Sequence, residues 1–369
     1  MNFSLTDEQQ MLEDAVRRFI EKEYSRAGTQ AHADTAGARG PGIRWQMFAE
    51  LGLLGLLVPD DYGGLAKDVT DALIVMRNLG RGLVKEPYIA NAIVAASILD
   101  RAGSAAQKAS WLPHLADGSA LFAIASEDDD DRPQAEGVCW RDGLLHGKKS
   151  VVLAGDHADW LIVPAQCVDS DQERLFCIDA RSAGVVMDIY PGIDDVSSAE
   201  IKFDGVQTEA SSELTAFVYG VSSLEWGLDI GRAALCAEAW GVMEVLLERT
   251  LEHLKTRTQF GKPLSSFQVL QHRVVDMMVS VEQTQSVALM AAAGIQSDSD
   301  VLRRQRVSAA KAMLGRYIRH VCEQTTQCLG GMGMTQEFEL TRYSRRLQAI
   351  GMTWGNTDFH MDRFAEVVA

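Results

Sequence analysis

The segment from Arg257 to Pro263 combines residue types that bind phosphates and flat rings. It reads Arg-Thr-Gln-Phe-Gly-Lys-Pro, and Phe267 and Gln268 follow it. An arginine donates a bidentate pair of hydrogen bonds to phosphate oxygens, and a phenylalanine offers a stacking face. The segment therefore suits a pyrophosphate joined to a planar ring. From spacing alone, a plain connection between two helices with a solvated arginine is the simpler explanation.

A second segment, 327–334, could offer backbone amides to a ligand. It reads Gln-Cys-Leu-Gly-Gly-Met-Gly-Met, and glycines at a helix end let the backbone approach a ligand closely. No strand precedes it and its spacing is not GxGxxG, so it is not a Rossmann fingerprint. Taken alone, it is better explained as a helix C-cap. A third segment at 59–64, Pro-Asp-Asp-Tyr-Gly-Gly, is typical of a surface turn.

These segments lie in a chain whose pattern predicts helices, then strands, then helices. In residues 1–118, apolar residues recur every three or four positions, which predicts helices. From about residue 119, short β-rich runs at intervals of roughly ten residues predict a small antiparallel sandwich or barrel. From 214 to 369, long helices predict a bundle. This order excludes a doubly wound sheet, whose strands alternate with helices.

The expected elements have the following bounds. The early helices include 45–58, 70–80, 87–102 and one that begins after Gly103 and stops at Pro113. The strands are 120–126, 149–153, 160–165, 174–178, 184–189 and 199–203. The late helices are 221–256, 268–296, 300–329 and 341–369.

Composition excludes several classes of function. The 369 residues carry 35 Lys+Arg against 51 Asp+Glu, a net charge of −16, which argues against a nucleic-acid binder. The six cysteines form no CxxC pair and the histidines show no ligand spacing, so we expect no metal site. The acidic run 127–131 is interpreted as a solvated loop rather than a calcium site. A polar N-terminus and the lack of a long apolar run predict a cytoplasmic protein that does not interact with membranes.

Taken together and in this order, the three segments resemble the acyl-CoA dehydrogenase superfamily over essentially the whole chain. Further matches are Leu112-Pro113, Asp117-Gly118, Lys148-Lys149 and Gly155. Within the superfamily, the chain is most similar to the small subunits of pimeloyl-CoA dehydrogenases. The similarity lies in the residues at 82–88, 149–152, 234–239 and 265–272. The resemblance implies a mainly α fold with a central β-domain. The expected parts are an N-terminal helical domain (1–118), a β-sandwich or barrel (119–213) and a C-terminal four-helix bundle (214–369).

The resemblance also implies non-covalent FAD, an acyl-CoA substrate and a set of cofactor contacts. Arg257 would hold the FAD pyrophosphate of a neighbouring subunit. Ser126 stands where family members place a threonine that hydrogen-bonds the flavin, and Val151-Val152-Leu153 replaces the usual Trp-Ile-Thr. The remaining contacts implied along FAD, at its adenine end and at its adenosine-side phosphates are Gln259, Phe260, Gln268, Gln327, Gly330 and Gly331.

The family reaction needs a carboxylate to remove the α-proton while a hydride passes from the β-carbon to the flavin. Most members carry a glutamate at the position of Trp354, and a second group carries it at the position of Gly231. Neither base is present here. Asp358 would share the face of Trp354 on a continuing helix and is the best candidate within the chain. Glu238 lies two turns from Gly231, too far to substitute without a shift, and Asp229, two residues before it, points elsewhere.

Three hypotheses remain open. The chain is a FAD-containing subunit of a heteromer whose acyl-CoA dehydrogenase-like partner supplies the base, or a self-sufficient homotetramer that uses Asp358, or a non-catalytic scaffold of the same fold. The third is motivated by the altered flavin wall at 151–153. The resemblance also implies an electron-transferring flavoprotein as the acceptor of electrons.

Overall fold

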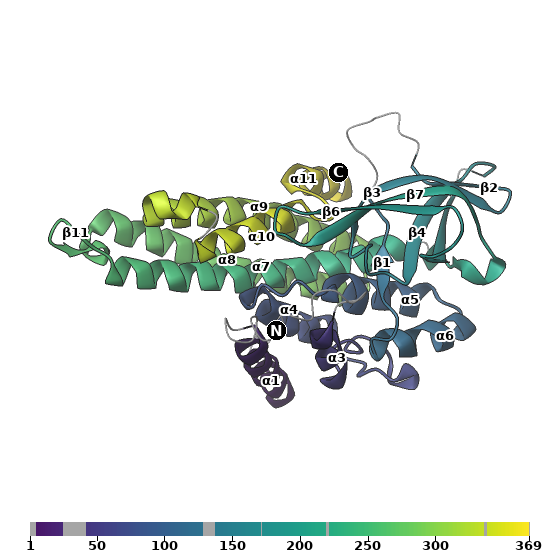
Figure 1. Ribbon diagram of the computed structural model, residues 1–369, viewed down its shortest axis with the longest axis horizontal. Coiled ribbons are helices and arrows are strands. Elements are labelled where there is room, and N and C mark those ends of the chain that lie inside the picture. The colour runs from purple at the N-terminus through teal and green to yellow at the C-terminus, as the bar shows by residue number, and fades with distance from the viewer. Residues whose placement is uncertain are drawn as a thin grey trace. The chain divides into compact units, whose positions relative to one another are not determined.

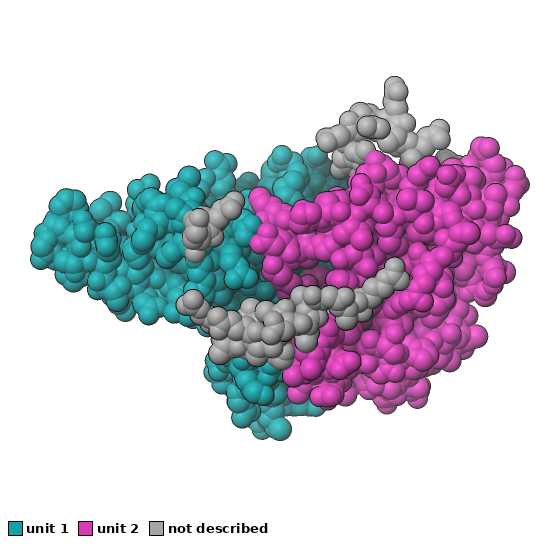
Figure 2. Space-filling view, in the orientation of Figure 1, with its two compact units in different colours: residues 1–29, 69–84, 232–369 teal, residues 30–68, 85–231 magenta. Residues whose placement is uncertain are grey.

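The computed structural model describes residues 5–24, 42–127, 137–170, 172–218, 221–335 and 338–368. Residues 128–131 of the acidic run lie outside these ranges. The contacts divide the chain into two compact units that are interleaved in sequence (Figure 2). Unit 1 comprises residues 1–29, 69–84 and 232–369, and unit 2 comprises residues 30–68 and 85–231.

Unit 1 is helical (Figure 1). Its first helix, α1 (Asp7–Glu23), begins at Thr6, whose hydroxyl accepts from the Gln9 amide in a capping box. The long helices are α7 (Ser223–Thr256, whose first residues belong to unit 2), α8 (Gln268–Ile295) and α9 (Asp300–Leu329). The shorter elements are α4 (Val69–Arg81), the hairpin β11 (Thr258–Gln259) and β12 (Lys262–Pro263), η5 (Leu264–Ser266), η6 (Gly330–Met334), α10 (Glu339–Met352) and α11 (Thr357–Val368).

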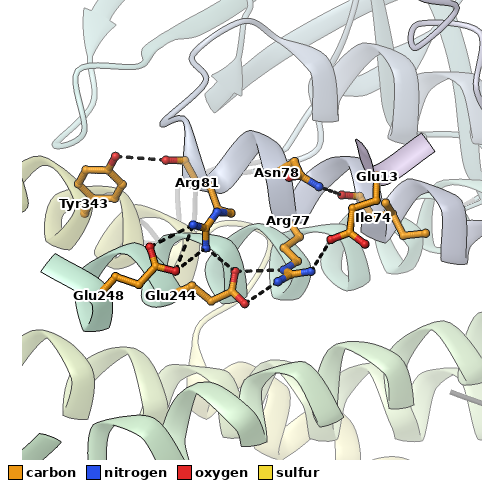
Figure 3. Close-up of polar contacts among 8 residues, drawn as sticks. All are labelled: Glu13, Ile74, Arg77, Asn78, Arg81, Glu244, Glu248 and Tyr343. Carbon is orange, nitrogen blue, oxygen red and sulfur yellow. Dashed lines mark hydrogen bonds and ion pairs between the residues drawn. The ribbon is translucent and has the colours of Figure 1, made fainter. Parts of the chain in front are cut away.

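A ladder of ion pairs fixes α7 against α1 and α4 (Figure 3). Arg77 on α4 bonds Glu13 of α1 at 2.9 Å and Glu244 of α7 at 2.7 Å. Arg81, one turn later, bonds Glu244 at 2.9 Å and Glu248 at 3.1 Å. Because Glu244 is shared by both arginines and Glu248 binds Arg81 through both oxygens, the ladder sets the register of α4 on α7 more firmly than a single exposed pair would.

Unit 2 joins short helices to a sheet. The helices are α3 (Ile43–Glu50), η2 (Asp60–Tyr62), the π-helix η3 (Ile89–Ala95), α5 (Ala96–Ala102), α6 (Ala105–Ala116) and η4 (Ala210–Ser212). The strands are β1 (Phe122–Ile124), β2 (Cys139–Arg141), β3 (Leu144–Leu153), β4 (Trp160–Cys167), β5 (Glu173–Asp179), β6 (Val185–Pro191), β7 (Ser197–Gln207), β8 (Glu213–Leu214), β9 (Phe217–Val218) and β10 (Val221–Ser222). The main sheet has the order β6-β7-β3-β2-β4-β5-β8, and β1 pairs with β4.

The sheet differs from the predicted antiparallel one. β1 and β2 both run parallel to β4, while the other pairs are antiparallel. β2 was not predicted, because three residues are too short to show the alternation that marks a strand. The sheet is therefore mixed, around a core that includes Leu161, Phe176 and Phe203.

Two predicted helix ends in unit 2 are wrong. The helix expected at 45–58 ends at Glu50, because Gly52 turns the chain at a φ of 72° and short turns carry on from there. Pro113 does not stop its helix and lies inside α6. Three more residues of α6 follow it, and its carbonyl still accepts from the Asp117 amide at 3.0 Å.

The glycine turn at 59–64 is a structural feature. A Cβ on Gly64 would lie 2.0 Å from the Val58 carbonyl oxygen, so only glycine fits there. Gly63 takes a φ of 82° with open space around it. The turn that contributes to the family resemblance is thus set by a close approach of two backbone segments.

Candidate active site

The position at which the resemblance places the catalytic base holds a buried tryptophan. Trp354 is 5% exposed and lies between α10 and α11. Its backbone is left-handed, with a φ of 52°, and Gly355 follows at a φ of 108°. A left-handed residue other than glycine costs on the order of 1 kcal/mol and persists only where its surroundings hold it.

Three buried side chains hold the backbone at this position. Arg232 Nε donates to the carbonyl oxygen of Trp354 at 3.0 Å, and His360 Nε2 lies 3.1 Å from the same oxygen. Lys311 Nζ donates to the carbonyl oxygen of Thr353 at 3.0 Å and to that of Ile350, one turn earlier. Because every acceptor is a backbone carbonyl, this grip does not depend on which side chain stands at position 354.

The surroundings of this segment are electropositive. His360 is fully buried, and burial, followed by the nearby charges of Arg232, Lys311 and Arg363, lowers its pKa to about 2. The imidazole is therefore neutral, and Nε2 carries the proton that faces the Trp354 carbonyl. A carboxylate at position 354 would be stabilised here, whereas an indole adds no charge and cannot accept a proton.

Glu238 is committed to an ion pair. Glu238 is 4% exposed. Its carboxylate bonds Arg346 of α10 through two contacts of 2.6 and 2.9 Å. A bidentate pair in this environment is structural, and it removes Glu238 from the candidates for a free base. Gly231, two turns earlier on α7, has no side chain to offer, and Asp229 is fully buried.

Asp358 does not share a face with Trp354. The helix expected over 341–369 breaks, since α10 ends at Met352 and α11 begins at Thr357. Asp358 is exposed in the first turn of α11 and lines a pocket of about 440 Å³ with Asn356 and Cys322. Trp354 is not among the described residues that line this pocket. The premise that made Asp358 the best candidate is therefore not met.

The segments predicted to bind FAD meet at one end of the helices of unit 1. The β11–β12 hairpin joins α7 to α8, and Arg273 near the start of α8 bonds Gln324 near the end of α9 at 2.5 Å. This antiparallel packing brings the start of α8 beside the end of α9. The predicted residues at this end are Arg257, Gln259, Phe260, Gln268, Gln327, Gly330 and Gly331.

This end of the unit is exposed. No residue between 255 and 276 is buried, and Phe260 is 87%, Val269 62% and Val275 57% exposed. Within the described ranges, the Arg257 guanidinium has no hydrogen-bond partner, and a Cβ on Gly330 or Gly331 would meet open space. An unengaged arginine, an exposed aromatic ring and open glycine backbone fit the pyrophosphate and ring predicted for them.

Ser126 lies in unit 2, just after β1. Its hydroxyl oxygen is buried and has no hydrogen-bond partner among the residues that the structure describes. An orphaned hydroxyl fits the flavin contact that the resemblance implies at this position. The neighbouring wall at 151–153 offers only aliphatic side chains.

Comparison with known proteins places the chain in a family. The model of the acyl-CoA dehydrogenase N-terminal domain matches residues 6–119, and that of the C-terminal domain matches residues 219–369. The chain belongs to the acyl-CoA dehydrogenase family. Members of this family are oxidoreductases that act on the CH–CH bond of acyl-CoA, and FAD is their cofactor. The fold predicted from the sequence, helical parts flanking a central sheet, is confirmed.

Individual relatives span nearly the whole acyl-CoA dehydrogenase chain. A probable acyl-CoA dehydrogenase of Bacillus subtilis, YngJ, is 28% identical over 95% of this chain and 96% of its own. The ChsE4–ChsE5 complex of Mycobacterium tuberculosis contains a chain with a TM-score of 0.89 at 22% identity, covering 100% of this chain and 99% of that one. A variant of the Tcur3481–Tcur3483 steroid ACAD reaches a TM-score of 0.86 at 25% identity, with 98% of both chains covered.

The described residues contain no cluster suited to a metal ion and no helix suited to span a membrane. No group of three or more His, Cys, Asp or Glu side chains in those ranges is placed to hold a metal ion. No helix in the same ranges combines the length and apolar character needed to cross a membrane.

The buried cations around Trp354 are the feature that sequence reasoning missed. Their signal was weak, because Arg232, Lys311 and Arg363 are ordinary members of helical patterns.

Proposed function

We propose that this chain is the FAD-containing small subunit of a heteromeric acyl-CoA dehydrogenase, and that a related partner chain supplies the catalytic base. The observation that carries the proposal is the buried indole of Trp354 at the base position. The other candidates offer no replacement. Gly231 has no side chain, Glu238 is paired with Arg346, and Asp358 lines a pocket that Trp354 does not line.

The retained parts support a role in binding FAD. Arg257, Phe260 and the glycines at 330–331 leave groups open for a cofactor at the exposed end of unit 1. FAD, when bound, accepts the hydride from the β-carbon of the acyl group. The residues of this chain would hold its phosphates and line its ring, while the proton of the α-carbon would pass to a carboxylate of the partner.

The exposed apolar residues of the same end support a partner of related fold. Phe260, Val269 and Val275 are each more than half exposed within the described chain, and Met278 further along α8 is 53% exposed. Large exposed apolar patches commonly mark protein interfaces. The complexes named above are assembled from two different proteins, which supports a mixed rather than a uniform assembly.

The resemblance to pimeloyl-CoA dehydrogenase small subunits favours a dicarboxyl-CoA substrate. Steroid side-chain and aromatic acyl-CoA thioesters are equally compatible with the residues. By the same family resemblance, the electrons would leave to an electron-transferring flavoprotein.

The test is to co-express the full chain with the acyl-CoA dehydrogenase-like protein encoded beside it and to purify through a tag on this chain. We expect a mixed complex with bound FAD that oxidises an acyl-CoA, whereas the chain alone does not. The proposal fails if no mixed complex forms and the chain alone oxidises an acyl-CoA at ordinary rates.

Two controls separate the alternatives. In the complex, Asp358→Asn should leave turnover unchanged, because Asp358 is not the base. A loss of turnover with bound flavin retained would instead support Asp358 as the base, and the same loss in the chain purified alone would support the self-sufficient homotetramer. A chain that purifies in every preparation without flavin, or with flavin that no acyl-CoA reduces, would support the scaffold.

A further inference from the structure

Two serine hydroxyls in unit 2 are buried without partners. Ser126 Oγ, after β1, and Ser150 Oγ, on β3, have no hydrogen-bond partner among the described residues. A buried hydroxyl left without a hydrogen bond destabilises the fold. Such groups in a native protein usually find a ligand or water, so two of them on neighbouring segments call for an explanation.

The two serines lie on segments that are tied together. The Ser150 amide donates to the Glu127 carbonyl at 3.0 Å, and Tyr190 donates its hydroxyl to the Ser150 carbonyl at 2.6 Å. Lys149 Nζ lies 3.5 Å from the Ser126 carbonyl. The backbone at both serines is thus engaged within unit 2, while their hydroxyls are left over.

Ser150 also lies in an irregularity of the sheet. In the β3–β7 ladder, Lys149 pairs with Ile201 and Val152 pairs with Ala199, so two residues of β3 stand opposite one of β7. Such a β-bulge redirects a side chain and is frequent next to active sites. The bulge comprises Ser150 and Val151, so it extends into Val151–Leu153, the stretch that replaces the Trp-Ile-Thr of the flavin wall.

The side chains of Val151–Leu153 cannot donate a hydrogen bond to a flavin. The pyrimidine edge of an oxidised flavin carries two carbonyl oxygens and N1, which accept hydrogen bonds, and an N3–H, which donates one. Leu153 stands where the family has a threonine hydroxyl, so it cannot donate. We propose that the Ser150 hydroxyl replaces that donor and, beside the Ser126 contact that the resemblance implies, hydrogen-bonds a flavin bound against unit 2. The inference rests on the proposed role in FAD binding and assigns Ser150 a role that the resemblance does not.

This assignment predicts opposite effects on the fold and on the cofactor. Neither hydroxyl bonds within the described chain, so Ser150→Ala should leave the thermal midpoint of the flavin-free protein unchanged or raise it. The same change should weaken FAD binding about 2- to 12-fold, the range for losing one hydrogen bond. It should also shift the visible absorption bands and the midpoint potential of the bound flavin.

The experiment measures FAD binding to the full-length chain, alone and in the mixed complex, by the fluorescence of free FAD. Ser150→Ala, Ser126→Ala and the double variant are compared with Ser182→Ala, a serine in the turn between β5 and β6. Ser150→Thr, which keeps the hydroxyl, should restore binding and spectrum.

The outcomes distinguish this inference from the proposed function. If FAD binds to the wild type and Ser150→Ala changes neither affinity, spectrum nor potential, the Ser150 assignment is wrong and the proposed function stands. The assignment is also wrong if Ser150→Ala destabilises the flavin-free protein as much as it weakens FAD binding, because that marks a structural role. If neither preparation of the wild type binds FAD, both the assignment and the proposed function fall.

Discussion

The low pKa of His360, caused by burial and nearby positive charges, should make the stability of the chain depend on pH. The residue is fully buried, and its pKa of about 2 in the folded chain lies far below the ordinary value of about 6.5. Below pH 6.5 the unfolded chain therefore takes up a proton that the folded chain refuses. The stability that His360 contributes is fully present above that pH and is lost as the pH falls towards 2.

The size of the effect follows from the two pKa values. Well below pH 6.5, the free energy of unfolding falls by about 1.4 kcal/mol per pH unit. Between pH 7 and pH 5 the loss attributable to His360 is about 2 kcal/mol, since the proton uptake begins only near 6.5. A His360→Gln variant keeps an N–H donor for the Trp354 carbonyl but cannot titrate, so it should lack this loss.

The assay is urea unfolding of the full-length wild type and of His360→Gln at pH 7 and pH 5. Other titrating groups are common to both proteins, so the difference between their pH dependences isolates His360. The exposed His272→Gln variant is the matched control and should follow the wild type. Equal pH dependences for the wild type and His360→Gln would show that the imidazole is not held neutral among cations, and the account of this segment would be wrong.

Three further predictions concern single side chains. Glu238→Gln should lower the free energy of unfolding by about 3 kcal/mol, because it leaves the charge of Arg346 without its buried partner; a urea titration measures this, and a change under 1 kcal/mol would contradict it. Gly64→Ala should destabilise the chain more than Gly63→Ala, whose cost is about 1 kcal/mol from its left-handed backbone alone; thermal melts rank the two. Asp358→Asn should leave the thermal midpoint and the flavin content unchanged, because its exposed carboxylate holds neither fold nor cofactor.

Helices with strong periodicity and clear ends could be predicted from the sequence. The helix at 300–329 has the bounds of α9, because Ser299 caps its start and Gly330 follows its end. The strands centred on 160–165 and 174–178 likewise match β4 and β5, whose apolar residues fill the core of the sheet. In these segments local signals and burial agree.

The break at Trp354 could not be predicted. Local propensity favours one continuous helix over 341–369, and no proline interrupts it. The break is held by side chains far away in sequence, Arg232 and Lys311, whose donors reach the carbonyls of the turn. The local signals were Gly355, whose φ of 108° is open only to glycine, and Asn356, whose side chain accepts from the Phe359 amide at 2.9 Å at the start of α11. The expectation that Asp358 shares the face of Trp354 failed for this reason.

The parallel pairings of β1 and β2 with β4 also could not be predicted from the sequence. Period-two alternation tells which residues face a core but not the direction of the partner strand. Ser150 shows the same limit, because its β-bulge is set by the pairing of β3 with β7, and the alternation of one strand does not identify its partner.

The central claim is that the proton acceptor belongs to another chain. The most direct measurement is flavin reduction by an acyl-CoA in the mixed complex, once with the base of the partner changed from glutamate to glutamine and once with Asp358→Asn in this chain. We expect the partner change to slow flavin reduction by about 10²–10⁴-fold and the change in this chain to leave the rate as it was. The reverse result, full activity with the altered partner and loss with Asp358→Asn, would contradict the account.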